Sequence, residues 1–395
     1  MNIPVPSVPY TDEDTELATF RRKFPILTRS VYLNSCAKGA LCTPVMDAYS
    51  QFLRDWDHYG SPWHMWMQKA EELRAALGKF MGAKANEIAL TLSVSSGADS
   101  IASALDYNKR HKVVLGDQEY PTMAQIWLAQ RSYGAQIEFV HSRTHCPTPE
   151  DYERVVDENT LIVPLTHVSF RNGSTLAVKE IAEVCHRRGA WVLLDDYQCT
   201  GTRPVDVKTL GVDFAVTGML KYMLGPPGIA FIYVREDLIS QLEPRFTGWF
   251  GRQDPFSLDI AKVNYADSAR RFETGTFPVG AIYGSLAALA LIESLGPQRI
   301  AAQISRVTQH VLPQLAEVGM KLTTPQDSLG PMVAIETDEL FPLLEHMARR
   351  NIIIAGRNNL FRASFHAYNT IADGDSLVES LRDWARERPS TASMR

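Results

Sequence analysis

The sequence lacks the patterns that define several broad classes of protein. It has no run of about 18 apolar residues that could span a bilayer. Its amino terminus has no basic region followed by an apolar stretch, as a secretory signal would. Long basic runs are also absent and the formal net charge is −5, so neither nucleic acid nor a membrane is an expected partner. Internal repeats and low-complexity tracts are missing as well.

Cysteine is scarce among the 395 residues: there are five, an odd number, with no CxxC pair. None has the spacing to histidine that metal sites show, so we expect no bound metal. Free thiols in a reducing compartment are the simplest interpretation, and we therefore expect a cytoplasmic protein.

The composition is that of a globular protein, with 45% hydrophobic and 22% charged residues, and the length suits a large domain with a smaller one. Between residues 86 and 235 short apolar runs alternate with segments of helical period. This alternation predicts an α/β fold with a mostly parallel seven-stranded sheet covered by helices on both faces. The predicted strands are Ile88–Leu92, Lys112–Leu115, Gln136–Val140, Leu161–Leu165, Trp191–Leu194, Phe214–Val216 and Ile229–Val234.

Helical spacing predicts an amphipathic helix over Trp63–Phe80 and another over Asp99–Tyr107. After Gly296 the pattern changes to that of a smaller α+β unit, with strands that include Ile352–Ile354 and Leu360–Ser364. We predict that residues 32–290 form the large domain and that residues 1–31 and 291–395 form the small one.

Two side chains near predicted strand ends suggest a chemistry. Asp195 closes one strand and Lys221 follows a later one, which places both at the edge where open α/β sheets bind ligands. A lysine there can form a Schiff base with an aldehyde, and a carboxylate can keep a pyridinium nitrogen protonated. The pair therefore suggests pyridoxal 5'-phosphate (PLP). Taken singly, Asp195 could cap a helix and Lys221 could be a solvated loop charge.

A second feature is the small polar run Ser95, Ser96 and Gly97, between a predicted strand and a helix. Backbone N–H groups and hydroxyls at a helix amino end can bind a phosphate. The alternative is that these serines only cap the helix.

Together these motifs resemble the class V aminotransferase family, fold-type I PLP enzymes that include cysteine desulfurases, selenocysteine lyases, kynureninases and isopenicillin N epimerase. The resemblance covers residues 32–370. It rests on Tyr32-Leu33-Asn34, Ser95-Ser96-Gly97, Glu119-Tyr120, Asp195-x-x-Gln198, Pro204-Val205-Asp206-Val207, Asp213-Phe214, Lys221, Gly225-Pro226-Pro227-Gly228, Arg271-Phe272-Glu273-Thr274-Gly275-Thr276 and Arg362-x-Ser-x-x-x-Tyr-Asn-Thr.

The resemblance implies a role for each matching residue. Lys221 would be the Schiff-base lysine, Asp195 would pair with the pyridine nitrogen, and Gln198 would contact the phenolic oxygen. Ser95, Ser96 and Gly97 would hold the phosphate, and Tyr120 would stack on the ring unless it is a core tyrosine. Arg362 would bind the substrate carboxylate, and Asn34 would also be a substrate-binding residue. Gly275 and Thr276 match a segment that reaches the neighbouring subunit's phosphate, which implies a homodimer with shared active sites.

The sequence also departs from the family pattern. Where many relatives have a histidine before the lysine and a serine two residues before that, this chain has Leu220 and Gly218. A cysteine desulfurase needs a thiolate on the loop before its carboxylate-binding arginine, and the short segment 354–361 has no cysteine. Cys36 is the only thiol with a route to the substrate, although a structural role is the alternative. Arg171 and Asn172 follow a strand end and could touch the ligand or form a turn.

These observations predict a PLP-dependent enzyme that acts on an α-amino acid. A lyase that eliminates a β-substituent or cleaves a C–S bond, without a desulfurase cysteine, is favoured. The substrate amine would displace Lys221, which would then remove the α-proton. Transamination, decarboxylation and epimerisation remain alternatives, as does a catalytically silent PLP-binding protein.

Overall fold

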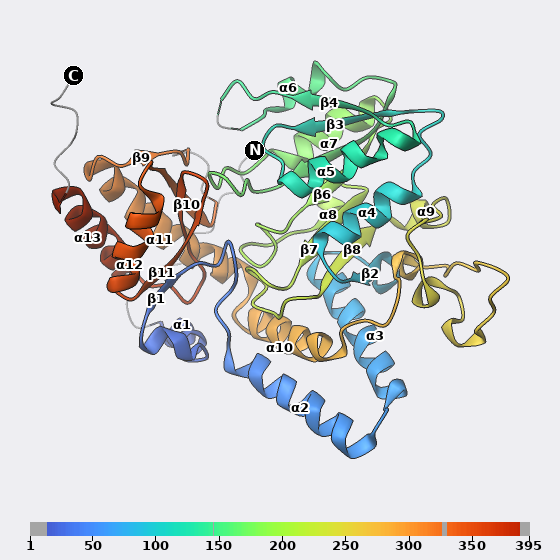
Figure 1. Cartoon of the computed structure of the whole chain (residues 1–395), viewed down its shortest axis with the longest axis horizontal. Helices are drawn as coiled ribbons and strands as arrows, with labels where there is room; N and C mark the ends of the chain where they lie inside the picture. The colour runs from blue at the N-terminus through green and yellow to red at the C-terminus, as the bar shows by residue number, and fades with distance from the viewer. Residues whose placement is uncertain (1–13, 145, 326–329, 388–395) are drawn as a thin grey trace.

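The structure, a computed structural model, describes residues 14–144, 146–325 and 330–387. Its strands form two sheets that occupy separate regions of the molecule, the larger at the right and the smaller at the left of Figure 1. The larger sheet has the order β2-β8-β7-β6-β5-β3-β4. Its strands are β2 (Ile88–Thr91), β3 (Lys112–Gly116), β4 (Gln136–Val140), β5 (Thr160–Thr166), β6 (Trp191–Asp195), β7 (Phe214–Gly218) and β8 (Ala230–Val234).

All strand pairs of this sheet are parallel except those of β8, which runs antiparallel to β2 and β7. Consecutive strand residues alternate between two hydrophobic clusters: Val114 belongs to one, and Val113 and Leu115 to the other. Because successive side chains point to opposite faces of a strand, the sheet has an apolar core on both sides. The predicted α/β fold with a mostly parallel seven-stranded sheet is confirmed.

Helices surround this sheet in the way that the alternating pattern predicts (Figure 1). Those between the strands are α4 (Val94–Ala104), α5 (Pro121–Ala129), α6 (Pro149–Glu153), α7 (Val178–Arg187) and α8 (Val207–Leu210), and α9 (Glu236–Ile239) follows β8 directly. Two longer helices, α2 (Thr43–Tyr59) and α3 (Trp63–Phe80), precede the sheet, and α10 (Val279–Leu295) follows it and packs against both of them.

The smaller sheet has the order β1-β11-β12-β10-β9. It comprises β1 (Val31–Leu33), β9 (Lys321–Leu322), β10 (Met332–Glu336), β11 (Ile352–Arg357) and β12 (Leu360–Ser364). Helices α1 (Thr15–Arg21), α11 (Pro297–Glu317), α12 (Leu340–Arg349) and α13 (Ile371–Glu387) lie in the same part of the molecule, at the left of Figure 1. The strand β1 pairs with β11, so it crosses the boundary predicted between residues 31 and 32. That domain division stays a prediction, and residues 1–13 of its first segment lie outside the described residues.

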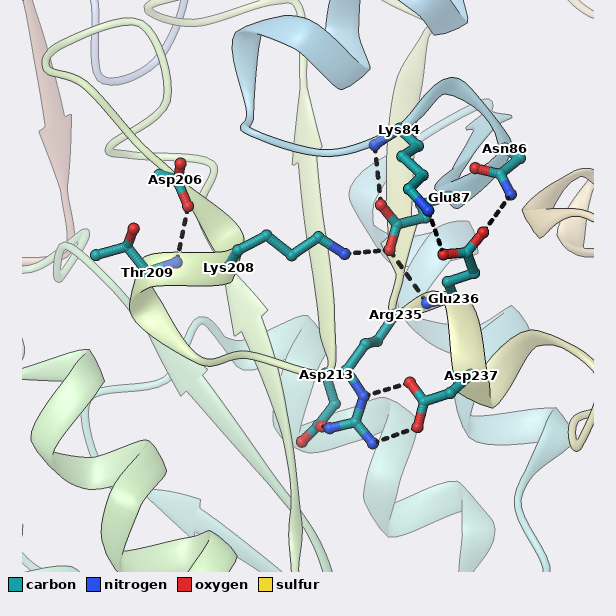
Figure 2. A network of polar contacts seen from close by, with 10 residues as sticks. All are labelled: Lys84, Asn86, Glu87, Asp206, Lys208, Thr209, Asp213, Arg235, Glu236 and Asp237. Atoms are coloured by element: carbon teal, nitrogen blue, oxygen red, sulfur yellow. Dashed lines mark hydrogen bonds and ion pairs between the residues drawn. The ribbon is translucent and has the colours of Figure 1, made fainter.

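A network of ion pairs joins loops at the amino end of β7, as Figure 2 shows. Glu87 is fully buried and accepts hydrogen bonds from the backbone N–H groups of Lys84 (2.8 Å) and Glu236 (3.1 Å) and from Lys208 Nζ. Asp213, also buried, pairs with Arg235 directly before β7 begins. This network therefore holds the sheet at the end opposite to the one where Asp195 and Lys221 lie.

No single helix among the described residues is long and apolar enough to cross a membrane. Taken together, the consecutive helices α10 and α11 have the length and apolar composition of a span, but they are bent by 75° relative to each other.

Candidate active site

Asp195 and Lys221 lie at the carboxyl ends of two neighbouring parallel strands. Asp195 is the last residue of β6, and Lys221 follows the end of β7 by three residues. Pairing of Asp195 with Val216 fixes the register of the two strands. The backbone oxygen of Asp195 also accepts a 3.0 Å hydrogen bond from the His167 N–H at the end of β5. The sheet thus fixes both residues at the edge where α/β folds bind ligands.

Burial shifts the pKa values of both groups toward neutrality, against their mutual attraction. Burial raises the pKa of Asp195 to about 6, against the Tyr197 backbone N–H that donates to its carboxylate at 3.0 Å. Burial also lowers the pKa of Lys221 to about 8, against the attraction of Asp195, and repulsion by Arg362 and Arg357 lowers it further. A lysine with this pKa has a usable neutral fraction near pH 7, which both Schiff-base formation and proton abstraction require.

Tyr197 fills space beside the lysine. Its ring centroid lies 3.9 Å from Lys221 Nζ. A Cβ on Gly218 would lie 2.9 Å from Tyr197 Cε2, closer than atoms can pack. The glycine that departs from the family pattern therefore provides the room that the Tyr197 ring occupies.

Tyr120 lies at the amino end of α5 and forms another wall of the site. Its ring centroid is 5.9 Å from Lys221 Nζ and 5.0 Å from the Phe170 ring, which it meets edge to face. Its hydroxyl accepts a 3.0 Å hydrogen bond from Arg357 Nη1. Tyr120 is half-buried beside the lysine, so it does not belong to the interior core that the sequence left as its alternative.

Arg362 reaches the site from the smaller sheet. It lies on β12, is 3% exposed and donates from Nη1 to the Phe170 carbonyl at 2.9 Å. Its Nε is buried without a hydrogen-bond partner among the described residues. A buried guanidinium with an unused donor is suited to bind a carboxylate.

The segment 34–36 connects the two sheets beside this arginine. Asn34 forms a β-bridge with Ser364, and its Oδ1 is buried without a partner in the part of the chain that the structure describes. The Cys36 N–H donates to Ser364 Oγ at 2.9 Å, while Gln198 Nε2 donates to the Cys36 carbonyl at 3.1 Å. Asn34 and Gln198 thus lie in one hydrogen-bonded region between Asp195 and Arg362.

The predicted phosphate cradle lies at the amino end of α4, which begins at Val94, five residues before the predicted start. Ser93 caps the helix, and Ser96 completes a capping box with it: Ser96 N donates to Ser93 Oγ (3.1 Å) and Ser93 N to Ser96 Oγ (3.0 Å). Gly97 is buried, and a Cβ there would lie 3.1 Å from Ile232 Cγ1, so its absence lets α4 approach the sheet. Ser95 is exposed at the second helical position. It takes no part in the capping box, so its hydroxyl is available to a ligand.

Gly275 and Thr276 are exposed in the segment before α10. The preceding Glu273 anchors that segment, because it accepts two hydrogen bonds from Arg74 (2.9 and 2.8 Å) and one from the Leu90 N–H (2.9 Å), all buried. Part of the Arg-Phe-Glu-Thr-Gly-Thr motif is therefore structural, and the two residues predicted to meet a phosphate lie at its exposed end.

Cys36, Arg171 and Asn172 were left with two interpretations each. Cys36 is buried with Tyr222, Met332 and Ala355, yet it lies near enough to Lys221 to affect its pKa. Asn172 Oδ1 accepts from the Ser174 N–H at 3.1 Å, and Gly173 has a φ of +74°, so this pair forms a turn. Arg171 is exposed.

Two buried groups behind the site were given no role from the sequence. His167 Nδ1 lies 2.5 Å from Asp196 Oδ1, and the charges of Cys199 and Asp196 raise the pKa of His167 to about 10 against the effect of burial. These three side chains form one cluster of metal-ligand types. Glu119 accepts from Thr166 N (2.9 Å) and Oγ1 (2.5 Å), and burial raises its pKa to about 8. Both His167 and Glu119 follow the end of a strand, and this position was the sequence signal that could have identified them.

The donor set fits PLP. Asp195 offers a buried carboxylate for a pyridinium nitrogen, Lys221 an amine whose pKa is lowered, and the amino end of α4 free N–H groups for a phosphate. The rings of Tyr120 and Tyr197, both within reach of Lys221 Nζ, provide apolar walls for an aromatic cofactor.

Comparison with known proteins gives the same result. A family model, "Aminotransferase class-V", matches residues 31–377. A curated relative, "Uncharacterized aminotransferase YcbU" of Bacillus subtilis (strain 168), is 34% identical over 364 residues, which cover 92% of this chain and 96% of the relative. A "Probable cysteine desulfurase" of Methanothermobacter thermautotrophicus is 26% identical, with 92% and 97% covered.

Solved structures share the fold. The cysteine desulfurase from Thermococcus onnurineus NA1 has 23% identity and a TM-score of 0.85, and the match covers 94% of this chain and 98% of that one. The cystine C–S lyase C-DES, in complex with its product cysteine persulfide, has 22% identity and a TM-score of 0.85, with 91% and 99% covered. Because the family model spans most of the chain and the relatives match nearly end to end, the chain belongs to the class V aminotransferase family and is a PLP-dependent enzyme.

Proposed function

We propose that this enzyme is a lyase that eliminates a β-substituent from an α-amino acid, such as the sulfur group of a cysteine-like substrate, without a catalytic cysteine of its own. The observation that carries the proposal is the turn between β11 and β12. It consists of Asn358 and Asn359, and it lies where a desulfurase of this family would need its nucleophilic thiol. Four of the five cysteines are buried, and Cys146 is half-buried.

The chain's own residues supply the remaining steps. Arg362 binds the α-carboxylate and so orients the substrate over Lys221. Bound PLP supplies an electron sink for the carbanion at Cα, and Asp195 keeps that sink charged. The neutral Lys221 amine accepts the α-proton, and the β-substituent leaves with its bonding electron pair. The released 2-aminoacrylate then reacts with one water to give pyruvate and ammonia.

Product analysis tests this proposal. We expect the purified enzyme, given β-substituted amino acids and no keto acid, to release pyruvate and ammonia in equal amounts, and the Lys221→Ala variant to release neither. Lys109→Ala, an exposed lysine, is the control. If the protein forms no product, and no amino acid changes the absorbance of its bound PLP, it binds the cofactor without catalysis. The proposal would then be wrong.

Transamination is the second candidate, because the 34% identical relative is named an aminotransferase. The same experiment separates the two reactions. Conversion of bound cofactor to its pyridoxamine form, with turnover only when a keto acid is added, would show an aminotransferase.

We further propose that the enzyme is a homodimer with shared active sites. Large apolar side chains are exposed on α2, at the bottom of Figure 1, and in the segment 256–263: Leu53, Trp56, Tyr59, Phe256, Leu258, Ile260 and Val263. Exposed apolar patches of this kind mark protein interfaces. All five cysteines are free, as expected in the reducing cytoplasm where we propose the protein works.

Mixing two inactive variants tests the shared site. If Thr276 serves the partner's site, a hybrid of Lys221→Ala and Thr276→Glu chains contains one site with neither change. Co-expressed chains should therefore regain activity, whereas each variant alone stays inactive. A monomer by sedimentation, or no regain in hybrids, would refute the shared site.

A further inference from the structure

The β11–β12 hairpin places two arginines on one face of the smaller sheet. In its register Ala355 pairs with Arg362 and Arg357 pairs with Leu360. Paired and alternate residues of antiparallel strands share a face, so Arg357 and Arg362 lie on the same side as diagonal neighbours, with Cα atoms about 7–8 Å apart.

The intervening residues face the other way. A Cβ on Gly356 would lie 2.9 Å from side-chain atoms of Leu340 and Leu344 on α12, and Phe361 is fully buried in the core of the smaller unit. The face that carries both arginines is therefore the one directed away from α12, toward Phe170 and Tyr120.

Contacts of Arg357 place it over the site. Its Nη1 donates to the Tyr120 hydroxyl at 3.0 Å, and its guanidinium carbon lies 5.7 Å from the centroid of that ring. Lys221 Nζ lies 5.9 Å from the same centroid. The repulsion by Arg357 that helps lower the pKa of Lys221 agrees with this proximity.

Neither arginine has an acidic partner among the residues that the structure describes. Within the described part of the chain the ion pairs engage many other arginines, such as Arg350 with Asp383, but no carboxylate lies within 4 Å of the Arg357 or Arg362 nitrogens. Arg362 suffices for one α-carboxylate. The site therefore holds one more guanidinium than a neutral amino acid needs, on an exposed hairpin tip where no packing requires it.

We propose that Arg357 binds a second negatively charged group, on the side chain of the amino-acid substrate, so that the enzyme selects acidic over neutral substrates. This inference rests on the proposed function, since it assigns the substrate class of that reaction. The Tyr120 hydroxyl holds the guanidinium in place before the substrate arrives. Arg357 acts in binding and specificity, and the proton transfers remain with Lys221.

A matched ligand pair tests the proposal. S-carboxymethyl-L-cysteine and S-carbamoylmethyl-L-cysteine have the same shape and differ in one charge. Absorbance titration of the PLP-loaded enzyme gives a Kd for each, and kcat/KM follows from product release. We expect the acid to bind about 10- to 100-fold more tightly than the amide, the range for a hydrogen bond between charged groups.

The variants separate specificity from structure. Arg357→Gln should abolish most of this preference, because it should raise the Kd of the acid and leave that of the amide unchanged. Arg357→Lys should retain part of the preference. Arg187→Gln, which removes an exposed arginine of an ion pair on α7, should change neither Kd. Because Arg357 is exposed, its variants should keep the wild-type melting temperature.

The outcomes also distinguish the two proposals. The role of Arg357 would be wrong if the wild type bound acid and amide equally, or if Arg357→Gln weakened the binding of both equally. Continued elimination in that case would leave the proposed function standing. If no amino acid changed the absorbance or gave product, the proposed function and this inference would both be wrong.

Discussion

Tyr197 and Gly218 occupy complementary space beside Lys221: a Cβ on Gly218 would approach the ring of Tyr197 to 2.9 Å. Gly218→Ala should therefore displace the ring and lower the free energy of unfolding by about 1–3 kcal/mol, the usual cost of overpacking. Urea unfolding of the apoprotein measures the change.

The double variant Gly218→Ala/Tyr197→Ala provides the control. Once the ring is absent, the added methyl group should cost little, so the two changes should be strongly non-additive. Additive effects would show that the ring does not depend on the glycine.

Lys221 should control the pH dependence of cofactor attachment. Burial lowers its pKa to about 8, and only the neutral amine attacks an aldehyde. The rate at which apoprotein combines with PLP should thus rise about tenfold from pH 7 to pH 9 and then level off. Stopped-flow absorbance measures it, with N-acetyl-lysine as the reference. A rate that kept rising about tenfold per pH unit beyond pH 9 would indicate an ordinary lysine.

Removing Arg362 should weaken substrate binding. Arg362→Ala removes a buried guanidinium placed for the α-carboxylate, so KM should rise at least about tenfold, as expected for a lost charged hydrogen bond. Arg362→Lys should recover only part of the substrate binding, because an ammonium cannot bind a carboxylate in bidentate fashion. Steady-state kinetics and a melting curve check both variants, and an unchanged KM in a folded Arg362→Ala enzyme would remove this residue from the substrate site.

Cys36 should be dispensable for chemistry. Cys36→Ala is expected to keep kcat/KM within about tenfold of the wild type, which corresponds to 1.4 kcal/mol. Cys146→Ala serves as the matched control. A loss of about a thousandfold or more in Cys36→Ala, with PLP still bound, would instead assign that thiol a catalytic role.

The buried pair of Arg74 and Glu273 should contribute strongly to stability. Glu273→Leu leaves a buried guanidinium with only the exposed Glu71 as partner, so we expect a loss of about 3 kcal/mol in the free energy of unfolding. Arg74→Met/Glu273→Leu should recover part of this loss, since no charge then stays buried alone. A single variant as stable as the wild type would contradict this account.

Regular elements with clear periodicity were predicted from sequence with their correct bounds. This holds for α3, whose apolar residues recur at helical spacing, and for β4 and β12. No element was assigned to α2, although its apolar residues Val45, Tyr49, Phe52 and Trp56 recur at helical spacing, so this helix was predictable and was missed. The start of α4 was missed because serine and glycine follow Val94 in its first turn, and the cap depends on side-chain hydrogen bonds between Ser93 and Ser96.

The same limit applies to the site. Asp195 and Lys221 could be placed from sequence because each follows an apolar strand, whereas Arg357 could not. The strand β11 was predicted to end at Ile354, and Gly356 and Arg357 read as loop residues. Pairing with β12 extends the strand to Arg357, and only that register reveals which way the guanidinium points.

The two-residue turn at Asn358 and Asn359 has an evolutionary consequence. Asn358 adopts a left-handed conformation (φ +55°), which closes the hairpin tightly. Since side chains alternate along a strand, one inserted residue in β11 would rotate Arg357 from the cofactor side to the α12 side. Relatives of this enzyme can therefore gain or lose that cation through a single insertion or deletion, without replacing any amino acid, so hairpin length should be read together with residue identity when homologues are compared.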